Sequence, residues 1–130
     1  MNTNRRTVLE ALAIISEPAH SPERIARWFD PDYQQQVDGQ VLDYAQFLIH
    51  MATLKTLTRR MTIDIIAIAD SGDTVLTHHQ VSVTKQDGQT SRIEVLAHFQ
   101  CREGRIVRCD ELTRLIAGDP ADADLGQRVA

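Results

Sequence analysis

The spacing of hydrophobic residues differs between the first and second halves of the chain. Up to about residue 54, apolar side chains recur every three to four positions, as in helices that bury one face. From residue 59 onward, apolar and polar side chains alternate, as in strands that bury one face. Helices first and strands second predict an α+β domain in which helices pack on one face of an antiparallel sheet.

Two helices are predicted in the first 30 residues. In the first, Val8, Leu12 and Ile15 share a face, and the helix ends at a Glu-Pro sequence because proline restricts the residue before it. Ser21 is the expected N-cap of the second helix, which has a proline in its first turn. This helix is short and is expected to end at the Asp-Pro-Asp sequence over residues 30–32.

A brief strand and a third helix follow. The strand is expected over residues 33–37, because an Asp-Gly turn comes directly after it. Asp43 and Gln46 have the spacing of a capping box, which predicts a helix from there to about Leu54. Apolar residues surround much of this helix, so we expect it to be buried on more than one side.

The second half of the chain predicts four long strands joined as an antiparallel meander. Glycine-containing joins around Gly72, Gly88 and Gly104 have the composition of tight hairpin loops. The expected strands cover residues 61–69, 74–85, 91–101 and 106–115. Residues 118–130 are polar and alanine-rich, which predicts a loosely ordered tail unless a partner holds it.

Composition narrows the classes of function. A chain of 130 residues can bury one core, so residues 1–130 are expected to form a single domain. The net charge is -4 and there is no basic stripe with interleaved aromatic residues, so nucleic acid is not an expected partner. No apolar run approaches the roughly 18 residues of a membrane span. We expect neither a membrane-inserted protein nor one that needs a metal or another cofactor.

Two features indicate the cytoplasm. Arg5 and Arg6 resemble a twin-arginine start, but acidic residues interrupt what would be the apolar part of an export signal. Cys101 and Cys109 have neither the spacing of a zinc site nor the density of a disulfide scaffold, so we interpret them as reduced core thiols.

The loop lengths predict which strand residues are neighbours. If the loops centred on Gly88 and Gly104 have three residues each, His79 pairs with Ala97, and Ala97 pairs with Glu111. These three residues then form a row across strands that lie about 4.8 Å apart, on the face that the helices cover. A carboxylate near an imidazole there is a candidate general acid–base pair, with Glu111 and His79 as catalytic residues. The alternative is a structural role without turnover, in which these two side chains satisfy each other or Glu111 bonds to the backbone at a helix end.

Other inward-facing residues are expected to complete a partly apolar pocket. On the first strand, Gln36 is the residue expected to face inward. His50, on the third helix, is interpreted as a satisfied, half-buried side chain rather than as a ligand. The expected ligand-binding residues are Gln36, Trp28, Tyr44, Phe47, Val81, Ala97, Phe99 and Cys109.

The opposite face of the sheet has a mixed character. Ile66, Ile68, Leu76 and Leu96 are expected to leave apolar surface among polar neighbours there. Such patches commonly mark an interface, so we expect a homodimer through this outer face.

The chain resembles the nuclear transport factor 2-like superfamily over nearly its whole length. The resemblance rests on the order of the elements, on the bend over residues 28–33 (Trp-Phe-Asp-Pro-Asp-Tyr), and on the hairpin over residues 103–107 (Glu-Gly-Arg-Ile-Val). It implies a cone-shaped, strongly curved sheet with three N-terminal helices packed on its concave face and closing over a small-molecule pocket. Ketosteroid isomerase, limonene epoxide hydrolase and SnoaL-like polyketide cyclases are members of this superfamily.

The three members differ in their catalytic residues, and this chain retains only some of them. Ketosteroid isomerases have a carboxylate base where this chain has Gln36, and a protonated acid where it has Ala97. The acid–arginine–acid trio of limonene epoxide hydrolase corresponds here to Val81, His79 and Glu111, so one carboxylate is missing. The SnoaL-like cyclases have an acid–base aspartate at the position of Glu111, which retains the carboxylate.

The sequence therefore predicts a SnoaL-like domain that binds a small hydrophobic or partly polar molecule. Isomerase, cyclase and hydrolase chemistry through the Glu/His pair remain open. The alternative function is that of a non-catalytic dimerisation or protein-interaction module.

Overall fold

Three helices precede the long strands, as the hydrophobic pattern predicts. The computed structural model describes residues 3–128. Ser21 caps the second helix by accepting a hydrogen bond from the Arg24 backbone N–H, and Asp43 forms the expected capping box with Gln46. The helices are α1 (Thr3–Ser16), α2 (Pro22–Trp28) and α3 (Tyr44–Leu57).

Six strands form one sheet in the order β2-β1-β6-β5-β4-β3. The long strands form the predicted antiparallel meander, whereas β1 runs parallel to β6, which makes the sheet mixed. The first strand begins directly after α2, earlier than expected, and it pairs with a short strand that the sequence did not predict. The strands are β1 (Phe29–Val37), β2 (Gln40–Asp43), β3 (Thr58–Ser71), β4 (Thr74–Lys85), β5 (Thr90–Arg102) and β6 (Arg105–Ala117).

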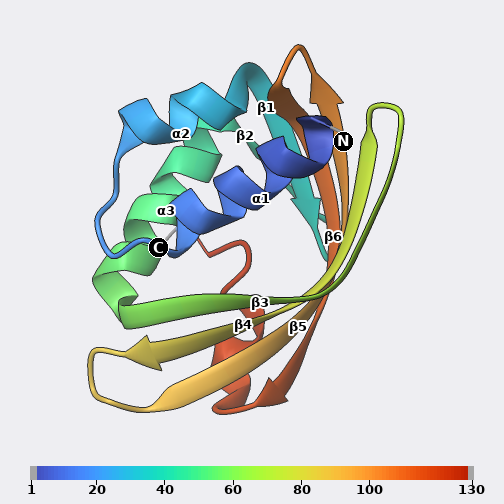
Figure 1. Cartoon of the computed structure of the whole chain (residues 1–130). Helices are drawn as coiled ribbons and strands as arrows, with labels where there is room; N and C mark the ends of the chain where they lie inside the picture. The colour runs from blue at the N-terminus through green and yellow to red at the C-terminus, as the bar shows by residue number, and fades with distance from the viewer. Residues whose placement is uncertain (1–2, 129–130) are drawn as a thin grey trace.

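The sheet curves strongly around the helices (Figure 1). All three helices lie on its concave side, and the long strands β3 to β6 bend around them. The core fills the space between the two layers, and Phe29, Tyr33 and Phe47 pack there with ring centroids 4.8–4.9 Å apart. The α+β class, the curvature and the position of the helices are confirmed.

The hairpin between β4 and β5 differs from the predicted one. Four residues, 86–89, separate the strands, and Val83 pairs with Ser91 instead of Ile93. As a result, Thr77 and not His79 lies opposite Ala97. The predicted pairing of His79 with Ala97 is therefore wrong. Because the slip equals two residues, every side chain remains on its expected face.

The hairpin between β5 and β6 has the predicted pairing, although its loop is shorter than the three residues expected. Only Glu103 and Gly104 separate the strands, and both have a positive φ, 53° and 80°. Two-residue hairpin turns require this backbone conformation. A bulge between Gln100 and Cys101 then restores the register, so that Ala97 lies opposite Glu111 as expected.

The C-terminal segment, residues 118–128, packs against the domain, whereas the sequence predicted a loosely ordered tail over residues 118–130, of which 129 and 130 lie outside the described residues. A short 3-10 helix, η1 (Pro120–Asp124), follows β6, and Leu125 is 3% exposed within the core cluster. Asp122 is also buried, and its carboxylate accepts a hydrogen bond from Ser91 Oγ at 2.6 Å and pairs with Lys85 Nζ at 3.1 Å. Figure 1 shows this segment turning back from the end of β6 and returning toward α3.

None of the helices within residues 3–128 is long and apolar enough to cross a membrane.

Candidate functional site

A cavity of about 90 Å³ lies between the helices and the concave face of the sheet. Its walls come from α1, α3, the strands β1 and β3 to β6, and the C-terminal segment. Most of the lining is apolar, including Phe47, Met51 and Phe99. Its polar lining residues are Tyr33, Gln35, His50, His79, Glu111 and Thr113.

Glu111 places a carboxyl group in this apolar environment. It lies on β6 and is half-buried. Cys109 Sγ donates a hydrogen bond to Glu111 Oε1 at 3.4 Å, and the described residues provide no ion-pair partner for this carboxyl. Burial raises the pKa of Glu111 to about 7, and the charge of Asp38 acts in the same direction, whereas the Cys109 bond opposes it. Glu111 therefore populates both its acid and its carboxylate form near pH 7.

His79 contributes a neutral imidazole to the same cavity. It is 3% exposed, and its Nδ1 lies 2.8 Å from Thr77 Oγ1. Burial and, to a smaller extent, the nearby His78 lower its pKa to about 4. At pH 7 the ring is uncharged, and within the described chain Nε2 has no hydrogen-bond partner. His79 can therefore form a hydrogen bond to a bound molecule through Nε2 while it is uncharged.

Glu111 and His79 do not touch each other. Glu111 shares its row with Ala97 and Thr77, whereas His79 shares the next row with Val95 and Thr113. Two strand spacings across and two residues along the strands separate their Cα atoms by about 12 Å on a flat sheet. The concave curvature brings the inward-pointing side chains closer together. Both side chains border the same cavity.

The similarity of this chain to known proteins agrees with its architecture. A family model described as "SnoaL-like domain" matches residues 6–109. The chain belongs to this family. An uncharacterized protein of Schizosaccharomyces pombe is 36% identical over 104 residues, which cover 80% of each chain. The resemblance to the nuclear transport factor 2-like fold is thereby confirmed.

Solved structures share the fold of this SnoaL-like domain at low sequence identity. IdmH from Streptomyces antibioticus, described as a proposed polyketide cyclase, has a TM-score of 0.73 at 17% identity, covering 97% of this chain and 98% of that one. TerC, crystallised with polyporic acid, has a TM-score of 0.70 at 19% identity, covering 92% of this chain and 94% of that one. At these identities the similarity establishes the fold alone.

Several of the predicted ligand-binding residues of the SnoaL-like domain border the cavity. Phe47, Val81 and Phe99 do so, together with His79 and Glu111. Both predicted acid–base residues therefore face one cavity, although they occupy different rows of the sheet.

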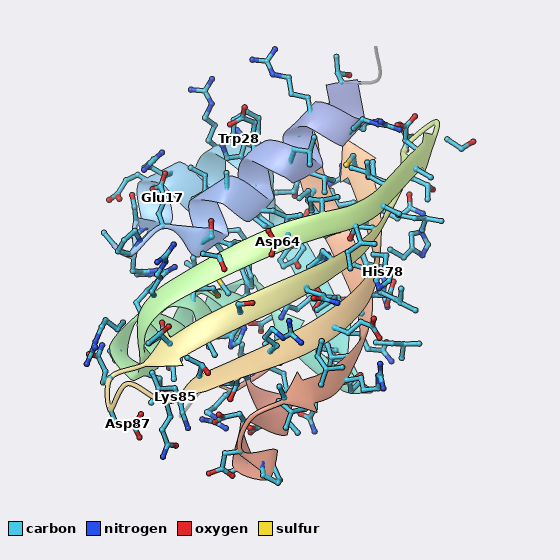
Figure 2. The ribbon with its side chains drawn as sticks, turned by 60° about the horizontal axis from the view of Figure 1, so that its bottom comes forward. Glu17, Trp28, Asp64, His78, Lys85 and Asp87 are labelled. Carbon is cyan, nitrogen blue, oxygen red and sulfur yellow. The ribbon has the colours of Figure 1, made fainter. Side chains whose placement is uncertain are left out.

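The remaining predicted ligand-binding residues lie elsewhere. Gln36 is on the outer face, where Arg108 Nη2 donates a hydrogen bond to its Oε1 at 3.4 Å. Trp28 and Tyr44 are half-buried against the core, and Figure 2 shows Trp28 beside the helices, away from the strands. Ala97 and Cys109 are buried in the core without bordering the cavity.

The error at Gln36 has a simple cause. Tyr33, Gln35 and Val37 form the buried side of β1, so Gln35 faces the cavity in its place. The Tyr33 hydroxyl donates a hydrogen bond to Gln35 Oε1 at 2.8 Å. Apolar side chains at both ends of the alternating run were a signal that the odd-numbered positions face the core.

Three further parts of the cavity wall were not predicted from the sequence. Thr113 follows Glu111 on the inner face of β6, and His50 of α3 is 2% exposed at the cavity. Leu125 and Gly126 close one side of the cavity from the C-terminal segment. The alternation of β6 was sufficient to find Thr113, but no local pattern predicts where a segment after the last strand will pack.

The cavity has no evident metal-binding geometry. Within residues 3–128, no group of three or more His, Cys, Asp or Glu side chains is arranged to hold a metal ion. The polar groups that line the cavity are carboxyl, imidazole, amide and hydroxyl groups.

Proposed function

We propose that this SnoaL-like domain binds a small, largely apolar molecule in the inner cavity and that Glu111 exchanges a proton with it. The observation that supports this proposal is a carboxyl group with a pKa of about 7 that faces an apolar cavity without a basic partner among the described residues. A structural carboxylate in such a place would normally be paired with a cation. A general acid or base is most effective when its pKa is close to the working pH.

The proposed chemistry is proton transfer at a carbon or oxygen atom of the ligand. The carboxylate form of Glu111 removes a proton, and the acid form returns one at a second position, so that no net proton is consumed. When its Nδ1 accepts from the Thr77 hydroxyl, the neutral His79 carries its hydrogen on Nε2 and donates it to the oxygen at which charge develops. Cyclisation and isomerisation need such transfers. Epoxide hydrolysis is less well supported because Val81 stands where a second carboxylate would be needed.

The volume of the cavity limits the ligand. Sites for drug-sized ligands commonly enclose about 300–1,000 Å³, whereas this cavity has about 90 Å³. The proposed ligand is therefore no larger than about one ring, unless the C-terminal segment moves. The small volume also favours the alternative of a non-catalytic module, so a direct test of turnover is needed.

Exchange of α-protons in a one-ring ketone tests the proposal. Cyclohexanone is incubated with the protein in D₂O at pH 7, and deuterium incorporation is followed by NMR. We expect exchange above the buffer rate, reduced about 100-fold or more in Glu111→Gln, in line with the usual contribution of a general base. Asp64→Asn is the control because Asp64 is an exposed carboxylate on the outer side of β3 (Figure 2). Exchange at the buffer rate, or equal rates in wild type and Glu111→Gln, would contradict the catalytic proposal.

We also propose that the outer face of the sheet pairs with a second copy of the chain. Leu76, Leu96 and Leu112 are 48–68% exposed there and border one shallow groove. Around them, Glu94 pairs with both His78 and Arg114, so the face carries charges of both signs and can complement itself. Ile66 is also exposed, but Ile68 packs against the core because a bulge between Ile65 and Ala67 reverses its facing.

Sedimentation velocity distinguishes this dimer from a monomer. We expect a dimer at micromolar concentration and a monomer for Leu112→Glu. Ile49→Glu is the matched control, since Ile49 is 52% exposed on α3, away from the outer face. A wild-type monomer, or equal dissociation by both substitutions, would contradict the proposed interface.

The proposed location of the protein is the cytoplasm. Cys101 and Cys109 are both buried free thiols. Their state is compatible with a reducing compartment.

A further inference from the structure

His50 is a second imidazole at the cavity, and the proposed proton transfer does not use it. It lies on α3, is 2% exposed, and borders the cavity. Its Nδ1 lies 2.7 Å from the main-chain oxygen of Arg128. Because a carbonyl oxygen can only accept a hydrogen bond, Nδ1 must carry a hydrogen. This contact defines the tautomer of the ring.

The other ring nitrogen then has a free lone pair. Burial lowers the pKa of His50, and the bond to the Arg128 carbonyl opposes this effect. In the neutral ring with hydrogen on Nδ1, Nε2 is an acceptor only. Among the described residues, none donates a hydrogen bond to Nε2. Because the His50 side chain is buried and borders the cavity, this acceptor is available to a group inside the cavity.

The C-terminal segment places the Arg128 carbonyl beside the ring. Arg128 Nη2 donates a hydrogen bond to the Ala121 carbonyl at 2.6 Å, and its guanidinium group also pairs with Asp124. These contacts fold the last described residues back onto η1. The segment itself is fixed to the sheet by buried Asp122 and to the core by Leu125. The position of the carbonyl is thus set by contacts on both sides.

We propose that His50 is a further ligand-binding residue, which accepts a hydrogen bond through Nε2 from an O–H or N–H group of the bound molecule. The main-chain carbonyl of Arg128 is the positioning group. The inference rests on the proposed function in one respect, namely that a small molecule enters the cavity. It adds a substrate class: a one-ring molecule with a hydroxyl or similar donor, such as a phenol or an enol.

The tautomer can be measured without any ligand. In protein labelled with ¹⁵N-histidine, long-range ¹H–¹⁵N correlation distinguishes a ring with hydrogen on Nδ1 from one with hydrogen on Nε2. The His50 signals are assigned by their absence in His50→Asn. We expect hydrogen on Nδ1 at pH 7, and hydrogen on Nε2 would overturn the proposal.

Arg128→Ala tests the positioning role. This substitution removes the contacts to Ala121 and Asp124, so we expect the His50 signals to show a mixture of the two tautomers. Arg114→Ala removes an arginine from the outer face and should leave the signals unchanged. An unchanged tautomer in Arg128→Ala would overturn the role of the C-terminal segment.

A pair of probes tests the acceptor role. Phenol and anisole have similar rings, but only phenol has an O–H group to donate. NMR titration of wild type should show at least fivefold tighter binding of phenol. His50→Asn keeps an amide donor for the Arg128 carbonyl and lacks Nε2, so the preference should fall to about one. Equal preference in wild type and His50→Asn would overturn the His50 role alone, whereas no binding of either probe to wild type would overturn it together with the proposed function.

Discussion

The raised pKa of Glu111 predicts that this residue makes the protein less stable as pH rises. In the unfolded chain the carboxyl titrates near 4.5, and in the folded domain near 7. Between these values the unfolded state loses its proton while the folded state keeps it, so the free energy of unfolding falls with increasing pH. At 1.36 kcal/mol per pH unit, the difference between pH 4 and pH 8 approaches about 3 kcal/mol. Because Glu111 is half-buried, solvent screens its charge, and this value is an upper limit.

The substitution Glu111→Gln removes this effect while preserving shape and hydrogen bonding. Urea unfolding of both proteins at pH 5, 6, 7 and 8 gives the difference in unfolding free energy, in which all other titrating groups cancel. We expect the variant to gain about 2–3 kcal/mol relative to wild type between pH 5 and pH 8. Parallel pH profiles would refute the reasoning, because they would mean that Glu111 ionises as freely in the folded domain as in the unfolded chain.

Three further predictions concern neighbouring parts of the molecule. Since the pKa of His79 falls from 6.5 to about 4 on folding, wild type should lose up to about 3 kcal/mol relative to His79→Gln as pH falls from 6.5 to 4, measured by urea unfolding. Asp122→Asn should cost about 2 kcal/mol in thermal unfolding because it weakens the bonds to Ser91 and Lys85, whereas exposed Asp64→Asn should cost nearly nothing. Gly118→Ala should cost about 2 kcal/mol or more, since φ is 119° and the new Cβ would lie 2.1 Å from Ser91 Oγ, whereas a change below about 0.5 kcal/mol would show that the segment does not depend on this contact.

The fold was largely predictable because its signals are local. The helix starts at Ser21 and Asp43 depend on side chains within three residues, and alternation along β4 to β6 identifies the buried face without knowledge of pairing. Strand β2 was missed because four residues provide too short a pattern. The parallel pairing of β1 with β6 joins segments about 75 residues apart, and no local feature specifies it.

For the candidate site, the sequence could predict which side of the sheet a residue points to, but not its position relative to the other site residues. Glu111 and His79 were found because alternation alone assigns them to the inner face. Their relative position was wrong because one loop has four residues and not three. The surroundings of His50 could not be predicted for a different reason: its Nδ1 partner is a main-chain carbonyl in the C-terminal segment, and main-chain atoms leave no signature in the sequence.

The pKa of Glu111 is raised and that of His79 is lowered, and these two shifts together determine the charge of the two groups at the cavity. Between about pH 4 and pH 7, Glu111 is largely protonated and His79 is neutral, so neither of these two groups is charged. A ligand that donates a hydrogen bond to Glu111 stabilises its carboxylate and lowers its pKa, whereas a ligand that accepts one stabilises the acid and raises it. By linkage, affinity for a donor ligand must then rise with pH through 7, and affinity for an acceptor ligand must fall. Cyclohexanone can only accept a hydrogen bond, so its affinity should fall as pH rises through 7 when the acid form of Glu111 contacts it, whereas an affinity independent of pH would show that Glu111 does not contact this ligand.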